Sequence, residues 1–171
     1  MLNNSLVLGI DLGTSGVRIA IINTKKKILF TSSRTYAKGL EIAEDWINSL
    51  KILIQEIPKD LKEKLVSCSV AGTSGTLLAC KRNGAPIGNA LPYFLSCSEY
   101  SNEIKKLFTK ESPGSSISGS VGRALRLLAL HGNEIILRHQ ADWISGWLIN
   151  NWEYGEEGNN IRMGWQISNS S

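Results

Sequence analysis

The sequence predicts an α/β fold with a mixed sheet that is opened by an antiparallel meander, and three observations support this fold class. Two short apolar runs, 5–10 and 17–22, are rich in Val, Ile and Leu and are separated by a glycine-rich turn. A third strand is expected at 27–31, which gives the order strand, turn, strand, turn, strand. An amphipathic helix and a strand at 65–70 follow, and this order is typical of a helix packed across a mixed sheet.

The flanking helices are predicted from the spacing of apolar residues. Over 42–57 these residues recur at intervals of three and four, and Pro58 ends the helix. A strand is expected at 76–80, and Asn83–Gly84 indicates a hairpin turn after it. Later helices are predicted at 98–109, 122–130 and 140–149, and no helix or strand is expected after them.

Composition indicates one soluble globular domain. The chain has 171 residues, of which 42% are hydrophobic and 20% charged, so it can bury a core without disulfides. The net charge of +4 is mild, and the one basic run, 25–27, is expected at a hairpin tip. No stretch interleaves aromatic and basic residues as a nucleic-acid groove does, so no nucleic-acid partner is expected.

The cysteines and the apolar runs indicate in which cellular compartment the protein is expected. Cys68, Cys80 and Cys97 have neither CxxC spacing nor a matching histidine pattern, so neither a zinc site nor a disulfide framework is expected. The first residues lack a basic region and a long apolar stretch, so no signal peptide is expected. No run approaches the length of a membrane-spanning helix. We therefore expect a cytoplasmic protein without a membrane partner.

The turn between the first two strands combines residue types that suit a phosphate and a metal ion. Gly13 allows a ligand to approach the backbone closely, and Thr14 and Ser15 add hydroxyl donors. Asp11 repels a phosphate unless a divalent cation lies between the two. An ordinary glycine-rich turn with Asp11 as its cap fits the composition equally well. The turn is no Walker loop, because it leads into a strand and not into a helix.

The stretch GIDLGTSGVRIAIIN resembles the first phosphate motif of the actin-like ATPase superfamily, and within it the FGGY family of carbohydrate kinases. The order of the first three strands, the amphipathic helix and the segment SCSVAGTSGTLLACKRNGAPI also match the N-terminal domain of that family. The resemblance covers nearly the whole chain. It implies a ribonuclease-H-like α/β domain with flanking helices.

The resemblance also implies a sugar-binding loop. In kinases similar to xylulokinase, the segment at 70–75 touches the sugar, which makes Gly72, Thr73 and Ser74 the expected substrate-binding residues. AGTSGT lacks the Met-His of bacterial xylulokinases and looks closer to the plant and cyanobacterial branch that is assigned to D-ribulose. HQADW and GEEGNN are similar to that branch as well. The expected substrate is a pentulose, D-ribulose or D-xylulose. A plain Gly-Thr-Ser turn is the alternative.

In such a kinase the cofactors are ATP and Mg²⁺. The resemblance implies that Asp11 holds hydrated Mg²⁺ through water, while Gly13, Thr14 and Ser15 contact the phosphates of ATP. FGGY kinases have a second domain with the adenosine motif and the catalytic base, and no such motif occurs in 1–171. We therefore expect no catalytic residue in this chain, which corresponds to the N-terminal domain and is inactive alone unless a separate chain supplies the C-terminal domain.

Two alternatives stay open. The chain can be a truncated, non-catalytic remnant that binds a sugar or a nucleotide, or another actin-like superfamily member such as an activator ATPase. Among the remaining polar residues, Arg123 and Arg126 could contact a phosphate, but the favoured interpretation is a solvated helix face. His139 is interpreted as a helix start with Asp142 in the first turn, and not as a general base or metal ligand.

Overall fold

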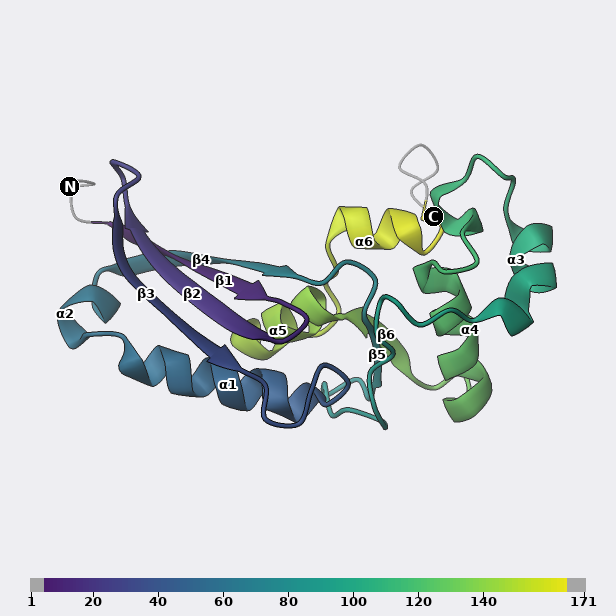
Figure 1. Ribbon diagram of the computed structural model, residues 1–171, viewed down its shortest axis with the longest axis horizontal. Coiled ribbons are helices and arrows are strands. Elements are labelled where there is room, and N and C mark those ends of the chain that lie inside the picture. The colour runs from purple at the N-terminus through teal and green to yellow at the C-terminus, as the bar shows by residue number, and fades with distance from the viewer. Residues whose placement is uncertain (1–4, 166–171) are drawn as a thin grey trace. The chain divides into compact units, whose positions relative to one another are not determined.

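The computed structural model describes residues 5–165, and the chain divides into two units, unit 1 ending at Gly72 and unit 2 beginning at Thr73. Figure 1 shows the elements of both units, coloured by their order along the chain. Unit 1 contains β1 (Leu6–Leu12), β2 (Gly16–Asn23), β3 (Ile28–Thr35), α1 (Ala43–Glu56), α2 (Lys59–Lys62) and β4 (Leu65–Gly72).

The sheet of unit 1 has the strand order β3-β2-β1-β4. β1 pairs antiparallel with β2, and β2 pairs antiparallel with β3, which confirms the predicted meander. β4 returns after the helices and pairs parallel with β1. The sheet is therefore mixed, as the order of predicted elements indicated.

Alternation along β1 and β2 explains the core of unit 1. Every second residue of β1 is buried, from Leu6 to Leu12, and the residues between them are partly exposed. α1 packs against β2 and β3 through a face that includes Trp46, Leu50 and Leu53. Burying one such side chain contributes about 1.5–3 kcal/mol. The other face of the sheet carries the polar and small residues that concern function.

Unit 2 contains two short strands and several helices. They are β5 (Leu77–Cys80), η1 (Ser98–Tyr100), α3 (Ser101–Leu107), η2 (Pro113–Ser115), α4 (Ser120–His131), β6 (Ile136–His139), α5 (Gln140–Ile149) and α6 (Glu157–Arg162). β5 and β6 form an antiparallel pair, and β5 and α4 supply the cluster Leu77, Ala79, Ala124 and Leu127. Within the described part of the chain, every helix is too short or too polar to cross a bilayer.

Two elements of unit 2 differ from the expectation. β6 was not expected from the sequence. Its four residues are too few for alternation of apolar and polar side chains to distinguish a strand from the start of the following helix. The prediction of no helix after 149 is wrong, because α6 forms in a segment of low helix propensity. Its N-cap is Glu156, whose carboxylate accepts hydrogen bonds from the N–H groups of Gly158 and Asn159, each at 2.9 Å.

Candidate functional site

The turn between β1 and β2 consists of Gly13, Thr14 and Ser15. Gly13 N donates to Gly16 O at 2.8 Å, which closes the turn. Tyr36 N donates to Ser15 O at 2.9 Å, so the turn is also tied to the end of β3. Thr14 and Ser15 are exposed, and their N–H groups make no hydrogen bond to a described residue. The turn thus presents two adjacent N–H groups and two hydroxyls.

The two glycines that flank the turn have different roles. A Cβ on Gly16 would lie 2.2 Å from Arg34 O, so only glycine fits beside the backbone of β3. A Cβ on Gly13 would lie 3.4 Å from the nearest atom, which is ordinary contact. Gly16 therefore serves packing. Gly13 is the glycine that leaves the backbone open to a ligand.

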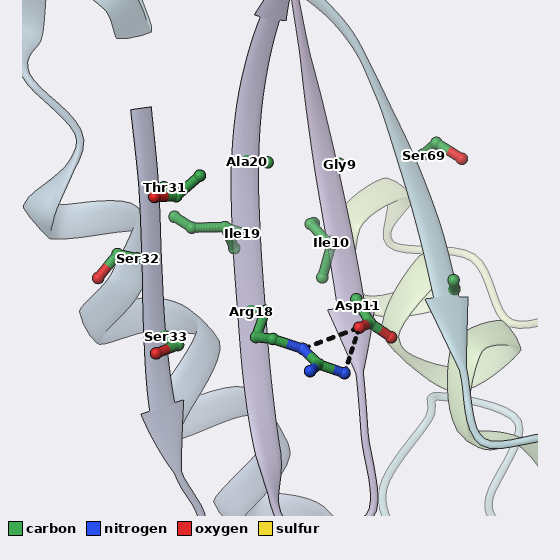
Figure 2. Close-up of a pocket in the computed structure, with 11 residues that line it drawn as sticks. Gly9, Ile10, Asp11, Arg18, Ile19, Ala20, Thr31, Ser32, Ser33 and Ser69 are labelled. Atoms are coloured by element: carbon green, nitrogen blue, oxygen red, sulfur yellow. Dashed lines mark hydrogen bonds and ion pairs between the residues drawn. The ribbon is translucent and has the colours of Figure 1, made fainter. Parts of the chain in front are cut away.

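Asp11 is paired with Arg18, which the sequence reasoning missed. The two residues are register partners across β1 and β2. Arg18 Nε donates to Asp11 Oδ2 at 2.9 Å, and Arg18 Nη2 lies 2.7 Å from the same oxygen; Figure 2 shows the guanidinium reaching from β2 to the carboxylate. An acid and a base at equal distances from Thr14–Ser15, the centre of the hairpin, are the signal that could have found this pair.

The ion pair is open to solvent. The side chains of Arg18 and Asp11 are 67% and 50% exposed. An exposed pair of this kind contributes about 0–1 kcal/mol, because water and salt screen the two charges. A stronger partner such as a phosphate or a metal ion can therefore separate them at little cost.

Two cavities meet at Arg18. One, of about 700 Å³, lies on the sheet face that carries Gly9, Asp11 and Ala20, and Figure 2 shows the strands that line it. The other, of about 380 Å³, surrounds the turn and is also lined by Arg34. Four hydroxyl residues line the turn cavity, Thr14, Ser15, Ser33 and Thr35, and no carboxylate does. This combination of arginine, hydroxyl and backbone N–H groups suits a phosphate.

The metal-binding capacity of the site rests on one carboxylate. The described residues contain no group of three or more His, Cys, Asp or Glu side chains that could hold a metal ion. Asp11 therefore fits an ion that takes its other ligands from water and phosphate. Mg²⁺ binds in this way in many nucleotide sites, through one or two carboxylates plus water and phosphate oxygens.

Gly72 lies beside the strand that leads into the turn. Leu12, the last residue of β1, and Gly72, the last residue of β4, are partners in the parallel register. The predicted sugar loop therefore starts at the same end of the sheet as Gly13–Ser15. This adjacency follows from the parallel pairing of β4 with β1; the order of predicted elements indicated a mixed sheet but not which strand pairs with β4.

Thr73 and Ser74, the next two predicted substrate residues, differ in accessibility. Thr73 Oγ1 lies 2.7 Å from both Gln140 Oε1 and Thr76 Oγ1, and Thr73 N donates to Gln140 Oε1 at 3.0 Å. The Thr73 hydroxyl is thus engaged within unit 2, where it fixes the loop. Ser74 is exposed and lines a pocket of about 270 Å³.

A buried polar chain lies next to that pocket. His139 Nε2 lies 3.1 Å from Ser120 Oγ, and His139 Nδ1 lies 3.6 Å from Asp142 Oδ2. Asp142 also accepts hydrogen bonds from Glu156 N at 3.0 Å and Asn159 Nδ2 at 3.2 Å, which anchors α6. His139 is the N-cap residue of α5 and Asp142 lies in its first turn, as predicted.

Arg123 does not lie on a solvated helix face, and that interpretation is wrong. It is 2% exposed, and its guanidinium donates to the carbonyl oxygens of Gly75, Tyr93, Leu95 and Ser118 at 2.8–3.0 Å. Burial lowers the pKa of Arg123. Its spacing of three and four from Ser120 and Leu127 was the signal for the buried face of α4. Arg126, by contrast, pairs with Glu99.

Comparisons with known proteins identify the fold. No family model matches the sequence. Among solved structures, glycerol kinase from Plasmodium falciparum with ADP superposes with a TM-score of 0.66 at 15% identity, over 83% of this chain and 34% of that one. Xylulose kinase from Rhodospirillum rubrum gives 0.68 at 15%, over 82% and 33%. Gluconate kinase from Lactobacillus acidophilus gives 0.64 at 13%, over 83% and 32%.

The chain therefore spans about a third of the length of these structures. At such identities the likeness is one of fold. The predicted α/β fold class is confirmed, because the chain has a mixed sheet with flanking helices and superposes on these solved structures. The predicted roles of individual site residues stay predictions.

Proposed function

We propose that this chain is the N-terminal, phosphate- and sugar-binding part of an ATP-dependent carbohydrate kinase. The observation that carries the proposal is the turn at Gly13–Ser15, with free backbone N–H groups and hydroxyls beside the Asp11–Arg18 pair. The shared fold with glycerol, xylulose and gluconate kinases supports it. A cytoplasmic location suits a kinase that consumes ATP, and Cys68, Cys80 and Cys97 are free thiols.

Phosphoryl transfer requires positioning and neutralisation of charge. In this proposal the N–H groups and hydroxyls of Thr14 and Ser15 donate to phosphate oxygens of ATP. The N–H of Gly13 is already bonded to Gly16 O inside the turn. Gly13 therefore contributes by allowing a phosphate to approach the backbone closely. Mg²⁺ supplies neutralisation of the phosphate charge when it is bound, and Asp11 accepts hydrogen bonds from its water ligands.

Arg18 has a part in the same arrangement. Arg18 lines both cavities, so its guanidinium can leave the carboxylate of Asp11 and meet a phosphate in the turn cavity. The small free energy of an exposed ion pair makes this exchange feasible. Arg18 thereby supplies a positive charge to a phosphate that binds near the carboxylate of Asp11.

The proposed acceptor is a pentulose, D-ribulose or D-xylulose, held by the loop Gly72–Ser74. Ser74 offers an exposed hydroxyl to the polyol, while Thr73 and Gln140 fix the loop from behind. The adenosine pocket and the catalytic base are assigned to a C-terminal domain that lies outside 1–171, on the same polypeptide or on a partner chain. The chain alone is proposed to be inactive.

A non-catalytic domain that binds a sugar or a nucleotide is the second candidate. Such a domain would use the same turn cavity and the same loop without transfer of a phosphoryl group. The two candidates predict the same binding and differ in turnover when a complementary C-terminal domain is supplied. A kinase gains turnover under those conditions, and a remnant does not.

Nucleotide binding tests the proposal directly. The full chain is titrated with ADP in the presence and absence of Mg²⁺, and binding is followed by the amide signals of Thr14 and Ser15 in NMR. We expect tighter binding with Mg²⁺, and we expect Asp11→Asn to remove that difference. Equal binding with and without Mg²⁺ in the unaltered chain would contradict the metal role of Asp11.

A further inference from the structure

Arg123 is a buried cation whose charge is not matched. Its Nε and Nη1 groups donate to four backbone carbonyls, and no carboxylate of a described residue forms an ion pair with it. Nη2 makes no hydrogen bond to a described residue. Carbonyl dipoles solvate a guanidinium without neutralising it, and a buried charge without an opposite charge is costly. An anion at Nη2 would remove that cost.

A pocket lies where such an anion would bind. The pocket of about 270 Å³ in unit 2 is lined by Arg123, Arg162 and five hydroxyl-bearing residues, and none of its lining residues is acidic. The five are Ser74, Tyr93, Ser116, Ser118 and Ser120. A Cβ on Gly75 would lie 2.9 Å from Arg123 Nη2 and 3.5 Å from Ser120 Oγ. The absence of a side chain at Gly75 therefore leaves Nη2 and the hydroxyl open toward one space.

Two further features of the pocket favour negative charge. Arg162 on α6 is exposed and makes no ion pair with a described residue. The twelve-residue helix α4 begins at Ser120, and its N-cap residue Gly119 supplies no side-chain acceptor for the first N–H groups. Such free N–H groups and the helix dipole attract anions. Ligand pockets of about 300 Å³ hold small molecules.

We infer that this pocket, hereafter the Arg123 pocket, binds the phosphate or carboxylate group of a small ligand. The inference goes beyond the proposed function, because it depends on unit 2 alone and holds whether or not the chain forms part of a kinase. The anion accepts hydrogen bonds from Arg123 Nη2, Arg162 and the hydroxyls of the pocket. Ser74, the exposed residue of the predicted sugar loop, lines the same pocket.

The test is an NMR titration of the full chain with inorganic phosphate, in a buffer free of other oxyanions. We expect saturable shifts of the amide signals of Ser118 and Gly119 and of the Arg123 Nε–H signal. Arg162→Gln should weaken this binding about tenfold, or about 1.4 kcal/mol, because the variant removes a charged hydrogen-bond donor from the pocket. Arg126→Gln is the matched control. This variant also removes one positive charge, but Arg126 lies on α4, pairs with Glu99 and does not line the pocket. Phosphate binding should therefore not change.

Further titrations identify the source of the anion. D-gluconate reports a carboxylate, and a pentulose 5-phosphate reports a phosphate ester. Absence of saturable shifts with both anions, or binding that Arg162→Gln does not weaken, would overturn the inference. If phosphate moves the signals of Thr14 and Ser15 only, the inference fails while the phosphate site of unit 1 stands.

Discussion

Arg18 Nη2 lies 2.7 Å from Asp11 Oδ2, so the one acid beside the β1–β2 turn is held by a base on the neighbouring strand. Both side chains are at least half exposed. The pair therefore orients the carboxylate without contributing much to the free energy of unfolding. Asp11 is therefore suitable for mutation, because its replacement changes the charge at the site while the free energy of unfolding changes little.

Asp11→Asn should abolish activity without unfolding the protein. In an enzyme completed by a C-terminal domain, we expect turnover to fall a hundredfold or more, because a positioned metal contributes several kcal/mol to transition-state stabilisation. The unfolding free energy of the chain should change by less than about 1 kcal/mol. Asp60→Asn, the same change at an exposed residue of α2, is the control. Unchanged turnover in Asp11→Asn would mean that Asp11 has no role in metal binding and that the turn only connects two strands.

The glycines at the ends of the turn should respond differently to alanine. Gly16→Ala puts a methyl group 2.2 Å from Arg34 O, and overpacking of this kind costs about 1–3 kcal/mol. Gly13→Ala meets only ordinary contacts, so we expect a stability change within about 0.5 kcal/mol. Its effect should fall on nucleotide binding instead. Denaturant unfolding and an ADP titration of both variants separate the two effects, and equal destabilisation would contradict the assigned roles.

Without a C-terminal domain, the 171-residue chain should not phosphorylate D-ribulose or D-xylulose at a useful rate. Loss of a general base alone costs about 10²–10⁴ in rate, and a half site cannot close around its substrates. ATP-dependent formation of the sugar phosphate by the purified chain is the measurement. Clear turnover that Asp11→Asn abolishes would show that the chain carries a complete active site.

Trp152 should make Gly146 intolerant of alanine. A Cβ on Gly146 would lie 2.4 Å from the Trp152 ring, and a Cβ on Gly84 would lie 2.1 Å from the same ring. Gly146 lies inside α5, where alanine is intrinsically better by about 1 kcal/mol. A net loss of unfolding free energy in Gly146→Ala therefore reports the tryptophan contact. Ser145→Ala, on the same helix, is the control, and a stabilised Gly146→Ala would contradict this packing.

Thiol reactivity should distinguish the three cysteines. Burial raises the pKa of Cys80 to about 11 and also raises the pKa of Cys97, while Cys68 is exposed on β4. Because the thiolate is the reactive form, a disulfide reagent at pH 8 should modify Cys68 rapidly and the other two slowly. Denaturant should release all three. Rapid reaction of Cys80 in the folded chain would contradict its burial.

The sequence was most informative where local pattern decides structure. The short run at 5–10, rich in Val, Ile and Leu, predicted β1, and the three- and four-residue spacing around Trp46 predicted α1 to within a residue at each end. Such signals depend on neighbours in the chain. The same reasoning found the composition of the turn but not Arg18, whose position follows from strand register.

Arg123 and α6 show where local reasoning fails. The charge of Arg123 indicated solvent, but its carbonyl partners at Gly75, Tyr93 and Leu95 lie 28–48 residues earlier in the chain. α6 forms in a glycine- and asparagine-rich segment because Glu156 caps it and Asp142 anchors it. Both depend on tertiary contacts that override local propensity.

Arg18 lines the cavity on the sheet face and the turn cavity, so under the proposed function binding in one is thermodynamically coupled to binding in the other. An anion that draws the guanidinium into the turn cavity leaves the carboxylate of Asp11 without its counter-charge on the sheet face. That face then becomes more attractive to a cation. By reciprocity, a cation that binds at Asp11 first releases Arg18 and raises the affinity of the turn for the anion by the same factor. Under the proposed function, one exposed arginine is thus enough to make the binding of a metal ion and a phosphate cooperative.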